Sequence, residues 1–105
     1  MGCLAKVPAV KLGVAAVQGA LKASGVKPEQ VEDVYYGQVL QAGAGQSPAR
    51  QVLLGAGCPD TTEATTINKV CASGMKAVML AAQNIQTGQR GVMVAGGMES
   101  MSMAP

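Results

Sequence analysis

Aromatic residues, histidine and charge are all scarce in this sequence. Its 105 residues include two tyrosines but no phenylalanine, tryptophan or histidine, and charged residues make up 13%, about half the share usual for a soluble globular domain. A core without large rings has to be built from Ala, Val, Leu, Ile and Met. Because so little charge is available for a solvated surface, we expect much of that surface to be covered, as in a fragment or an obligate oligomer.

These shortages exclude several classes of function. Without histidine, and with three cysteines that lack a Cys-x-x-Cys spacing, neither a zinc site nor another metal site is expected. The formal net charge of +2 comes from scattered basic residues, so nucleic-acid binding has no support. No apolar run reaches the roughly 18 residues of a membrane-spanning helix, and no targeting peptide is visible. The odd number of cysteines favours reduced thiols.

Three segments have the patterns of helices. Apolar residues recur at helical spacing over 8–24, and Gly25 follows as a residue that commonly ends a helix. Ser47 and Pro48 are a favourable N-cap and first helical residue, so they predict the start of a second, short helix. Residues 71–88 predict a third helix that is apolar on nearly all sides and therefore buried.

The segments that favour β-strands alternate with these helices, and they are 34–40, 62–70 and 91–96. The last is continuously apolar, which is typical of a strand buried on both faces. The alternation predicts the α/β class, with a parallel or mixed sheet and covering helices. Because the pattern begins on a helix and three strands leave open sheet edges, we expect that a first strand is lacking.

Cys71 is the residue that most suggests chemistry, because it lies between a predicted strand and a predicted helix. Unpaired N–H groups at a helix start stabilise a thiolate, which lowers the pKa of a cysteine below its usual value of about 8.5. The small residues Ala72, Ser73 and Gly74 leave room for a carbonyl carbon beside the sulfur. A structural cysteine is the commoner occupant of such a position, and spacing alone leaves both interpretations open.

Three segments, in order along the chain, resemble the thiolase family. Residues 67–85, INKVCASGMKAVMLAAQNI, resemble the segment in which an Asn-x-x-Cys-x-Ser-Gly block carries the acylated cysteine. Residues 37–57, GQVLQAGAGQSPARQVLLGAG, are similar to a strand, Gly-rich loop and helix of that family. Residues 92–105, VMVAGGMESMSMAP, resemble its Gly-Gly-Met-Glu-Ser-Met-Ser signature. Within the family, the block around Cys71 is most similar to mitochondrial-type acetoacetyl-CoA thiolases.

The resemblance implies a thiolase-like N-terminal half over 1–105, in which 1–7 is an irregular or non-native start and the loop and C-terminal domains are absent. It implies an acetyl-CoA C-acetyltransferase that forms and cleaves acetoacetyl-CoA through an acyl-thioester on Cys71. Coenzyme A is then a substrate or product, and no cofactor is needed. The alternatives are a longer-chain 3-ketoacyl-CoA thiolase, a ketoacyl synthase-like condensing enzyme and a non-catalytic thiolase-fold scaffold.

The resemblance also implies a biological setting. Its acyl-CoA substrates belong to fatty acid and ketone body metabolism, and the full-length chain is expected to form a homodimer or homotetramer. The implied location is mitochondrial, with the cytoplasm as the alternative. The family's C-terminal half supplies histidines and a second cysteine in a Cys-x-Gly turn. Since this sequence contains neither, we expect the 105 residues alone to be inactive.

Several other residues are weaker candidates for the acyl-binding site or for the structure that supports it. Met98 and Met101, with Met103, have soft and adaptable side chains that suit an acyl or pantetheine pocket, although packing is their commoner role. Glu99 is either a hydrogen-bonding carboxylate behind the site or a solvated loop acid. Arg50 is expected to hold the Gly-rich loop by donating to its carbonyl groups.

Overall fold

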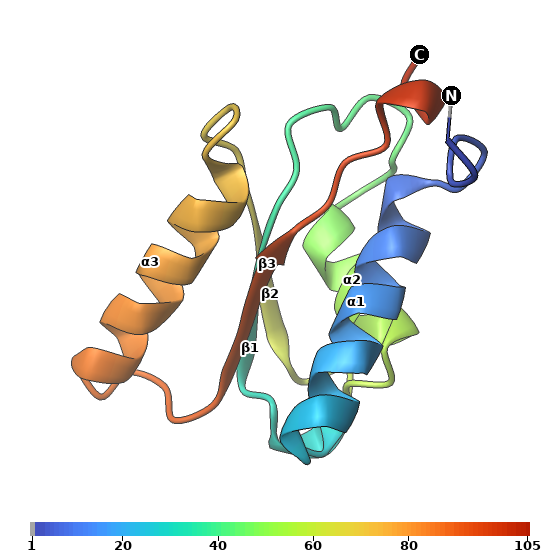
Figure 1. Cartoon of the computed structure of the whole chain (residues 1–105). Coiled ribbons are helices and arrows are strands. Elements are labelled where there is room, and N and C mark those ends of the chain that lie inside the picture. The colour runs from blue at the N-terminus through green and yellow to red at the C-terminus, as the bar shows by residue number, and fades with distance from the viewer. Residues whose placement is uncertain (1) are drawn as a thin grey trace.

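A three-stranded parallel sheet lies at the centre of the molecule, with helices on both of its faces (Figure 1). In this computed structural model, which describes residues 2–105, the strands are β1 (Asp33–Gly37), β2 (Glu63–Ile67) and β3 (Met93–Gly97). Their spatial order is β2-β1-β3. The α/β class is therefore confirmed, and the sheet among the described residues is parallel rather than mixed.

The helices divide between the two faces of the sheet. Helix α3 (Ser73–Gln86) covers one face, while α1 (Ala9–Ser24) and α2 (Pro48–Gly55) pack side by side on the other (Figure 1). Two short 3-10 helices follow α1 and β3, at Pro28–Gln30 and Met101–Met103. All three helices and all three strands thus lie where the sequence predicts them, with shorter strands than expected. No helix in residues 2–105 has the length and apolar character needed to cross a membrane.

The strands are in register, so that their carboxyl ends meet at one edge of the sheet. Gly37 at the end of β1 lies opposite Ile67 of β2 and opposite Gly97 of β3. In open parallel sheets, ligand sites form outside the carboxyl ends of the strands. The turn that leads into α3 starts from this edge, and so does the segment that follows β3.

The larger core lies between the sheet and helices α1 and α2. Its fully buried aliphatic side chains are Val17, Val34, Val52 and Leu53. Cys58, which follows α2, belongs to the same cluster. Burial raises the pKa of the Cys58 thiol and that of the Tyr36 hydroxyl, because both are neutral groups whose charged forms lose hydration in this core.

Helix α3 has the predicted position but not the predicted burial. Only Ser73, Ala77 and Ala81 are buried, on the side that faces the sheet. The large apolar side chains on its other sides are exposed: Met75, Val78, Met79 and Ile85. The prediction of burial on all sides is wrong for these residues, because the sheet covers one face of the helix and nothing in residues 2–105 covers the other.

Strand β3 differs from its prediction for a related reason. Residues 93–96 are half-buried and Gly97 is exposed, so the strand is not buried on both faces. It lies at one edge of the sheet, and β2 lies at the other. Neither outer edge has a partner strand within residues 2–105. The free edges are consistent with a sheet that continues beyond these three strands.

Both predicted helix ends are confirmed in position, although the N-cap of α2 lacks its side-chain hydrogen bond. Gly25 adopts the left-handed conformation, with φ 75°, and its N–H donates to the Leu21 carbonyl, so it ends α1 as predicted. Ser47 occupies the predicted N-cap position and Pro48 is the first helical residue, but Ser47 has a φ of 46° and its side chain accepts no hydrogen bond from the helix. The Thr66 hydroxyl of β2 accepts from the Ala49 N–H instead, at 3.0 Å. A strand 17 residues away therefore caps α2.

The first residues of the chain form turns rather than a strand or helix. Turns occupy residues 3–6, and the Val7 carbonyl accepts a hydrogen bond of 2.8 Å from the Ser100 hydroxyl. This bond joins the start of the chain to the segment after β3. Met1, the first residue of the segment 1–7, lies outside the described residues.

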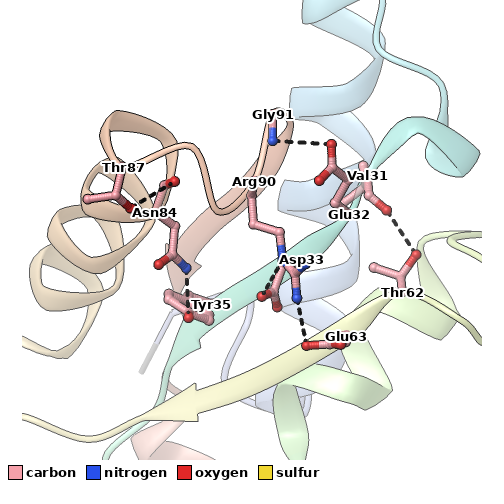
Figure 2. Close-up of polar contacts among 10 residues, drawn as sticks. All are labelled: Val31, Glu32, Asp33, Tyr35, Thr62, Glu63, Asn84, Thr87, Arg90 and Gly91. Atoms are coloured by element: carbon pink, nitrogen blue, oxygen red, sulfur yellow. Dashed lines mark hydrogen bonds and ion pairs between the residues drawn. The ribbon is translucent and has the colours of Figure 1, made fainter.

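A polar network closes the opposite edge of the sheet, at the amino ends of the strands (Figure 2). Asp33 and Glu63 are directly opposite each other on β1 and β2, where two like charges repel. Arg90 lies between them, with Nε 3.3 Å from Asp33 Oδ2 and Nη2 2.8 Å from Glu63 Oε2. The hydrogen bond to Asp33 and the charge of Glu63 raise the pKa of Arg90. This cation holds the two strands in register.

Candidate active site

Cys71 lies in a tight turn between β2 and α3, two residues before the helix begins. The Ala72 N–H donates to the Lys69 carbonyl at 3.0 Å, and the Ser73 N–H donates to the Val70 carbonyl at 3.1 Å. Val70 has a φ of 47°, in the left-handed region that β-branched residues rarely enter. The turn therefore projects Cys71 from a compact and strained backbone, and the cysteine is exposed.

The start of α3 is pressed against the carboxyl ends of β1 and β3. A Cβ on Gly37 would lie 2.6 Å from the Ser73 carbonyl carbon and 2.8 Å from the Gly74 nitrogen. A Cβ on Gly97 would lie 3.1 Å from the Gly74 Cα. Glycine at 37 and 97 is thus what lets the helix start approach the sheet. Cys71 is brought to the sheet edge by this close contact.

The first turn of α3 has free hydrogen-bond donors. Within residues 2–105, no acceptor is bonded to the backbone N–H groups of Gly74 and Met75. Free N–H groups at the start of a 14-residue helix carry partial positive charge. Cys71 precedes this helix start directly, whereas Cys3 lies in the initial turns and Cys58 is buried in the core. Of the three thiols, only Cys71 combines exposure with a helix start.

A cavity of about 580 Å³ opens beside Cys71. Its walls include Met98 and Met101 from the segment after β3, and Val39 and Leu40 from the segment after β1. Met98 is buried, while Met101 is 75% exposed. The structure thus brings both predicted methionines to the same cavity as the cysteine. Met103, in contrast, lines a second cavity of about 230 Å³ beside the Gly-rich loop.

Glu99 holds two walls of the larger cavity together. Its Oε1 accepts from the Val39 N–H at 2.8 Å, and its Oε2 accepts from the Leu40 N–H at 2.9 Å. Of the two interpretations of this residue, the hydrogen-bonding carboxylate is confirmed. The Gln38 N–H still donates to the Ile67 carbonyl of β2 at 3.0 Å, whereas the N–H groups of Val39 and Leu40 donate to a side chain 60 and 59 residues away instead of to a strand.

The prediction for Arg50 is wrong. Its Nη1 donates to the carbonyl of Asp60, a residue that follows α2, at 3.4 Å, and not to a carbonyl of the Gly-rich loop. Gln51 holds that loop instead, because its Nε2 donates to the carbonyls of Ala44 and Gln46, both at 2.9 Å. Gln51 was not among the residues predicted to hold the loop, although its place in the first turn of the helix after the loop was an available signal.

No three side chains of His, Cys, Asp or Glu in residues 2–105 are grouped so that they can hold an ion. The features that the structure brings together at the candidate site are a thiol, a helix start and an apolar cavity. Such an arrangement is suited to nucleophilic attack on a carbonyl carbon attached to an apolar group.

Comparisons with known proteins agree with this geometry. The family profile for the thiolase N-terminal domain matches residues 1–105. The chain is 58% identical over 105 residues to the mitochondrial acetyl-CoA acetyltransferase of Mus musculus and 61% identical over 104 residues to that of Danio rerio. It is 55% identical over 105 residues to a cytosolic acetyl-CoA acetyltransferase of Gibberella zeae.

Each of these matches includes 99% or more of this chain but only about a quarter of the relative, namely 25% or 26% of its length. A crystal structure of the Acat5 thiolase from Ascaris suum, in complex with coenzyme A, superposes with a TM-score of 0.97 and 43% identity. That match covers 99% of this chain and 27% of the Ascaris chain. The chain therefore belongs to the thiolase family, whose N-terminal domain it matches over its whole length.

Proposed function

We propose that this chain carries the nucleophile of an acetyl-CoA C-acetyltransferase, and that Cys71 accepts the acyl group. The observation that carries the proposal is the exposed Cys71 thiol at the mouth of an apolar cavity, on a strained turn that leads into α3. The names of the mouse, zebrafish and Gibberella relatives support the same reaction.

In the first half-reaction the Cys71 sulfur attacks the carbonyl carbon of an acyl-CoA thioester. A new C–S bond forms, the bond to the sulfur of coenzyme A breaks, and coenzyme A leaves with the proton that Cys71 has lost. The free N–H groups of Gly74 and Met75 add partial positive charge at the helix start that follows Cys71.

In the second half-reaction the acetyl group leaves Cys71. A second acetyl-CoA, deprotonated at its α-carbon, attacks the acyl carbon, so that a C–C bond forms while the C–S bond to Cys71 breaks. The product is acetoacetyl-CoA, and the reverse direction cleaves it with coenzyme A. Met98, Met101 and Leu40 provide the apolar wall for the acyl group, and Glu99 fixes that wall through two backbone N–H groups.

Both half-reactions need groups that accept and donate protons. The sequence contains no histidine, and the nearest carboxylate in the cavity wall, Glu99, already accepts two hydrogen bonds. We therefore assign the proton transfers to the regions of the relatives that this chain does not match. The chain supplies the nucleophile and part of the acyl pocket, and the complete reaction needs the rest of a thiolase.

The exposed apolar side of α3 supports a covered position for this helix in the complete protein. We propose that the complete protein is a homodimer or homotetramer that binds acyl-CoA, as the Ascaris thiolase binds coenzyme A. For its location we propose the mitochondrion, in keeping with the mouse and zebrafish relatives. The cytosolic relative of Gibberella makes the cytosol the alternative.

The proposal is tested by incubating a full-length thiolase that contains this chain as its N-terminal domain with acetyl-CoA, and by mapping acetyl groups on the cysteines of this chain by peptide mass spectrometry. We expect the acetyl group on Cys71, and its loss in Cys71→Ser. Cys3 is the matched control, because it is also exposed but lies in the initial turns and lines neither of the two cavities described above. Acetylation of Cys3 at the same rate as Cys71 would show that the site confers no special reactivity, and would refute the proposal.

A further inference from the structure

Val70 is held in a backbone conformation that its own side chain disfavours. Its φ of 47° is left-handed, and among the described residues only Ser47 shares a positive φ without being glycine. For a β-branched residue this conformation is a genuine outlier, and such strain persists only where the surroundings enforce it. The Val70 side chain is 66% exposed, so packing of that side chain does not enforce it.

The hydroxyl of Ser73 is bonded to both sides of the strained residue. Its Oγ donates to the Val70 carbonyl at 2.6 Å and accepts from the Lys69 N–H at 2.8 Å. Ser73 is 4% exposed, so water does not compete for either bond. Lys69 and Val70 are the two residues before Cys71. One buried hydroxyl is therefore bonded both to the Lys69 N–H and to the Val70 carbonyl. The conformation of these two residues determines the direction in which the Cys71 side chain points.

We propose that Ser73 is a positioning residue for Cys71. Its hydroxyl keeps Val70 left-handed, and the left-handed Val70 presents the Cys71 sulfur at the helix start and at the mouth of the cavity. Ser73 does not contact the reacting atoms in this assignment; it acts through the backbone of Lys69 and Val70. The catalytic consequence rests on the proposed function of Cys71, whereas the conformational consequence does not.

The hydroxyl can be separated from the packing of the same residue. Ser73 lies against Gly37, where a Cβ would be 2.8 Å from the Ser73 Cβ. Ser73→Ala keeps this Cβ contact and removes only the hydroxyl, which leaves the Lys69 N–H without its acceptor. Val70→Gly is the complementary change, because glycine enters the left-handed region without steric cost. If the hydroxyl serves to hold Val70, then Val70→Gly should make the hydroxyl dispensable.

The test compares the chain with Ser73→Ala, Val70→Gly and the double variant, using two readouts. The first is the NMR cross-peak between the amide proton and Hα of Val70, which is strong at positive φ. The second is the rate of Cys71 acetylation by thiophenyl acetate, an activated thioester, divided by the rate of Cys71 alkylation by iodoacetamide in the same variant. The division removes changes in simple accessibility of the thiol. Urea unfolding checks that each variant is folded.

We expect Ser73→Ala to weaken the Val70 cross-peak and to lower the rate ratio about tenfold, the order of loss expected from a misplaced reacting group. We expect the double variant to recover the ratio to within about twofold of the parent. The proposal is overturned if Val70 stays left-handed in Ser73→Ala or if the rate ratio of Ser73→Ala equals that of the parent. It is also overturned if the rate ratio of the double variant is no higher than that of Ser73→Ala. If acetylation is absent from every variant while the cross-peak weakens as expected, the hold on Val70 stands and the proposed function of Cys71 fails.

Discussion

The close contact between Gly37 and the start of α3 makes a quantitative prediction. In Gly37→Ala the new Cβ would lie 2.6 Å from the Ser73 carbonyl carbon and 2.8 Å from the Gly74 nitrogen. Both of these atoms belong to the backbone, so no side-chain rotation relieves the clash, and α3 has to move away from the sheet. Overpacking of this kind costs about 1–3 kcal/mol.

Two other glycine substitutions provide matched controls. In Gly74→Ala the new Cβ would meet Gly97 at 3.7 Å, an ordinary contact, and in Gly19→Ala of α1 it would meet nothing within 4 Å. Both positions are helical, where Ala is favoured over Gly by up to about 1 kcal/mol. We therefore expect Gly37→Ala to destabilise the fold and both controls to leave it unchanged or stabilise it.

Urea unfolding followed by circular dichroism measures the difference. With a denaturant slope of about 1–2 kcal/mol/M for a chain of this size, a loss of about 2 kcal/mol lowers the midpoint for Gly37→Ala by about 1–2 M. The controls should unfold at or above the midpoint of the parent chain. If Gly37→Ala unfolds within about 0.5 kcal/mol of the parent, or if Gly74→Ala is equally destabilised, then the helix start is not pressed on the sheet as described.

Three further predictions concern stability and activity. Burial raises the pKa of Cys58 and of Tyr36 above their ordinary values of 9.0 and 10.0, so their neutral forms stabilise the fold below those values. The urea midpoint should therefore fall as pH rises above about 9. Cys58→Ala should remove the earlier part of this fall, and a variant whose urea midpoints follow the same pH profile as the parent would contradict the prediction. Arg90→Met should lower the urea midpoint, because Asp33 is left buried without its cation. Adding Asp33→Asn to Arg90→Met should recover part of the loss. Equal midpoints for Arg90→Met and the parent would show that Arg90 does not stabilise the paired strands. The purified 105-residue chain should not turn over acetoacetyl-CoA and coenzyme A, since it has no histidine to serve as base; turnover near that of an intact thiolase would show that this expectation is wrong.

Local signals were sufficient to predict most of the framework from the sequence. The apolar spacing over 8–24 and the glycine at 25 predicted α1 and its end, because both depend on neighbours within one or two helical turns. The strand-to-helix junction at Cys71 was predicted for the same reason. Met98, Met101 and Met103 were candidates for an acyl pocket because of their soft side chains, with packing as the alternative; the structure places Met98 and Met101 in the cavity beside Cys71 and Met103 in the second cavity.

The features that escaped the sequence depend on partners far away along the chain. The side-chain acceptor at the start of α2 belongs to Thr66 and not to the N-cap residue Ser47. The N–H groups of Val39 and Leu40, which follow β1, donate to Glu99, about 60 residues later. The left-handed Val70 carries no sequence signal, since valine is among the least suited residues for that conformation. The burial of α3 was overestimated, because an apolar surface in a sequence does not say whether its cover lies within the same 105 residues.

The central claim is that Cys71 carries the acyl group during turnover, and trapping that intermediate tests it most directly. A full-length thiolase that contains this chain as its N-terminal domain would be mixed with acetoacetyl-CoA, quenched with acid during the first turnover and digested for mass spectrometry. We expect one acetyl group, on the peptide that contains Cys71, and its disappearance when coenzyme A is added before the quench. An acetyl group on another residue, or turnover that persists in Cys71→Ser, would contradict the account.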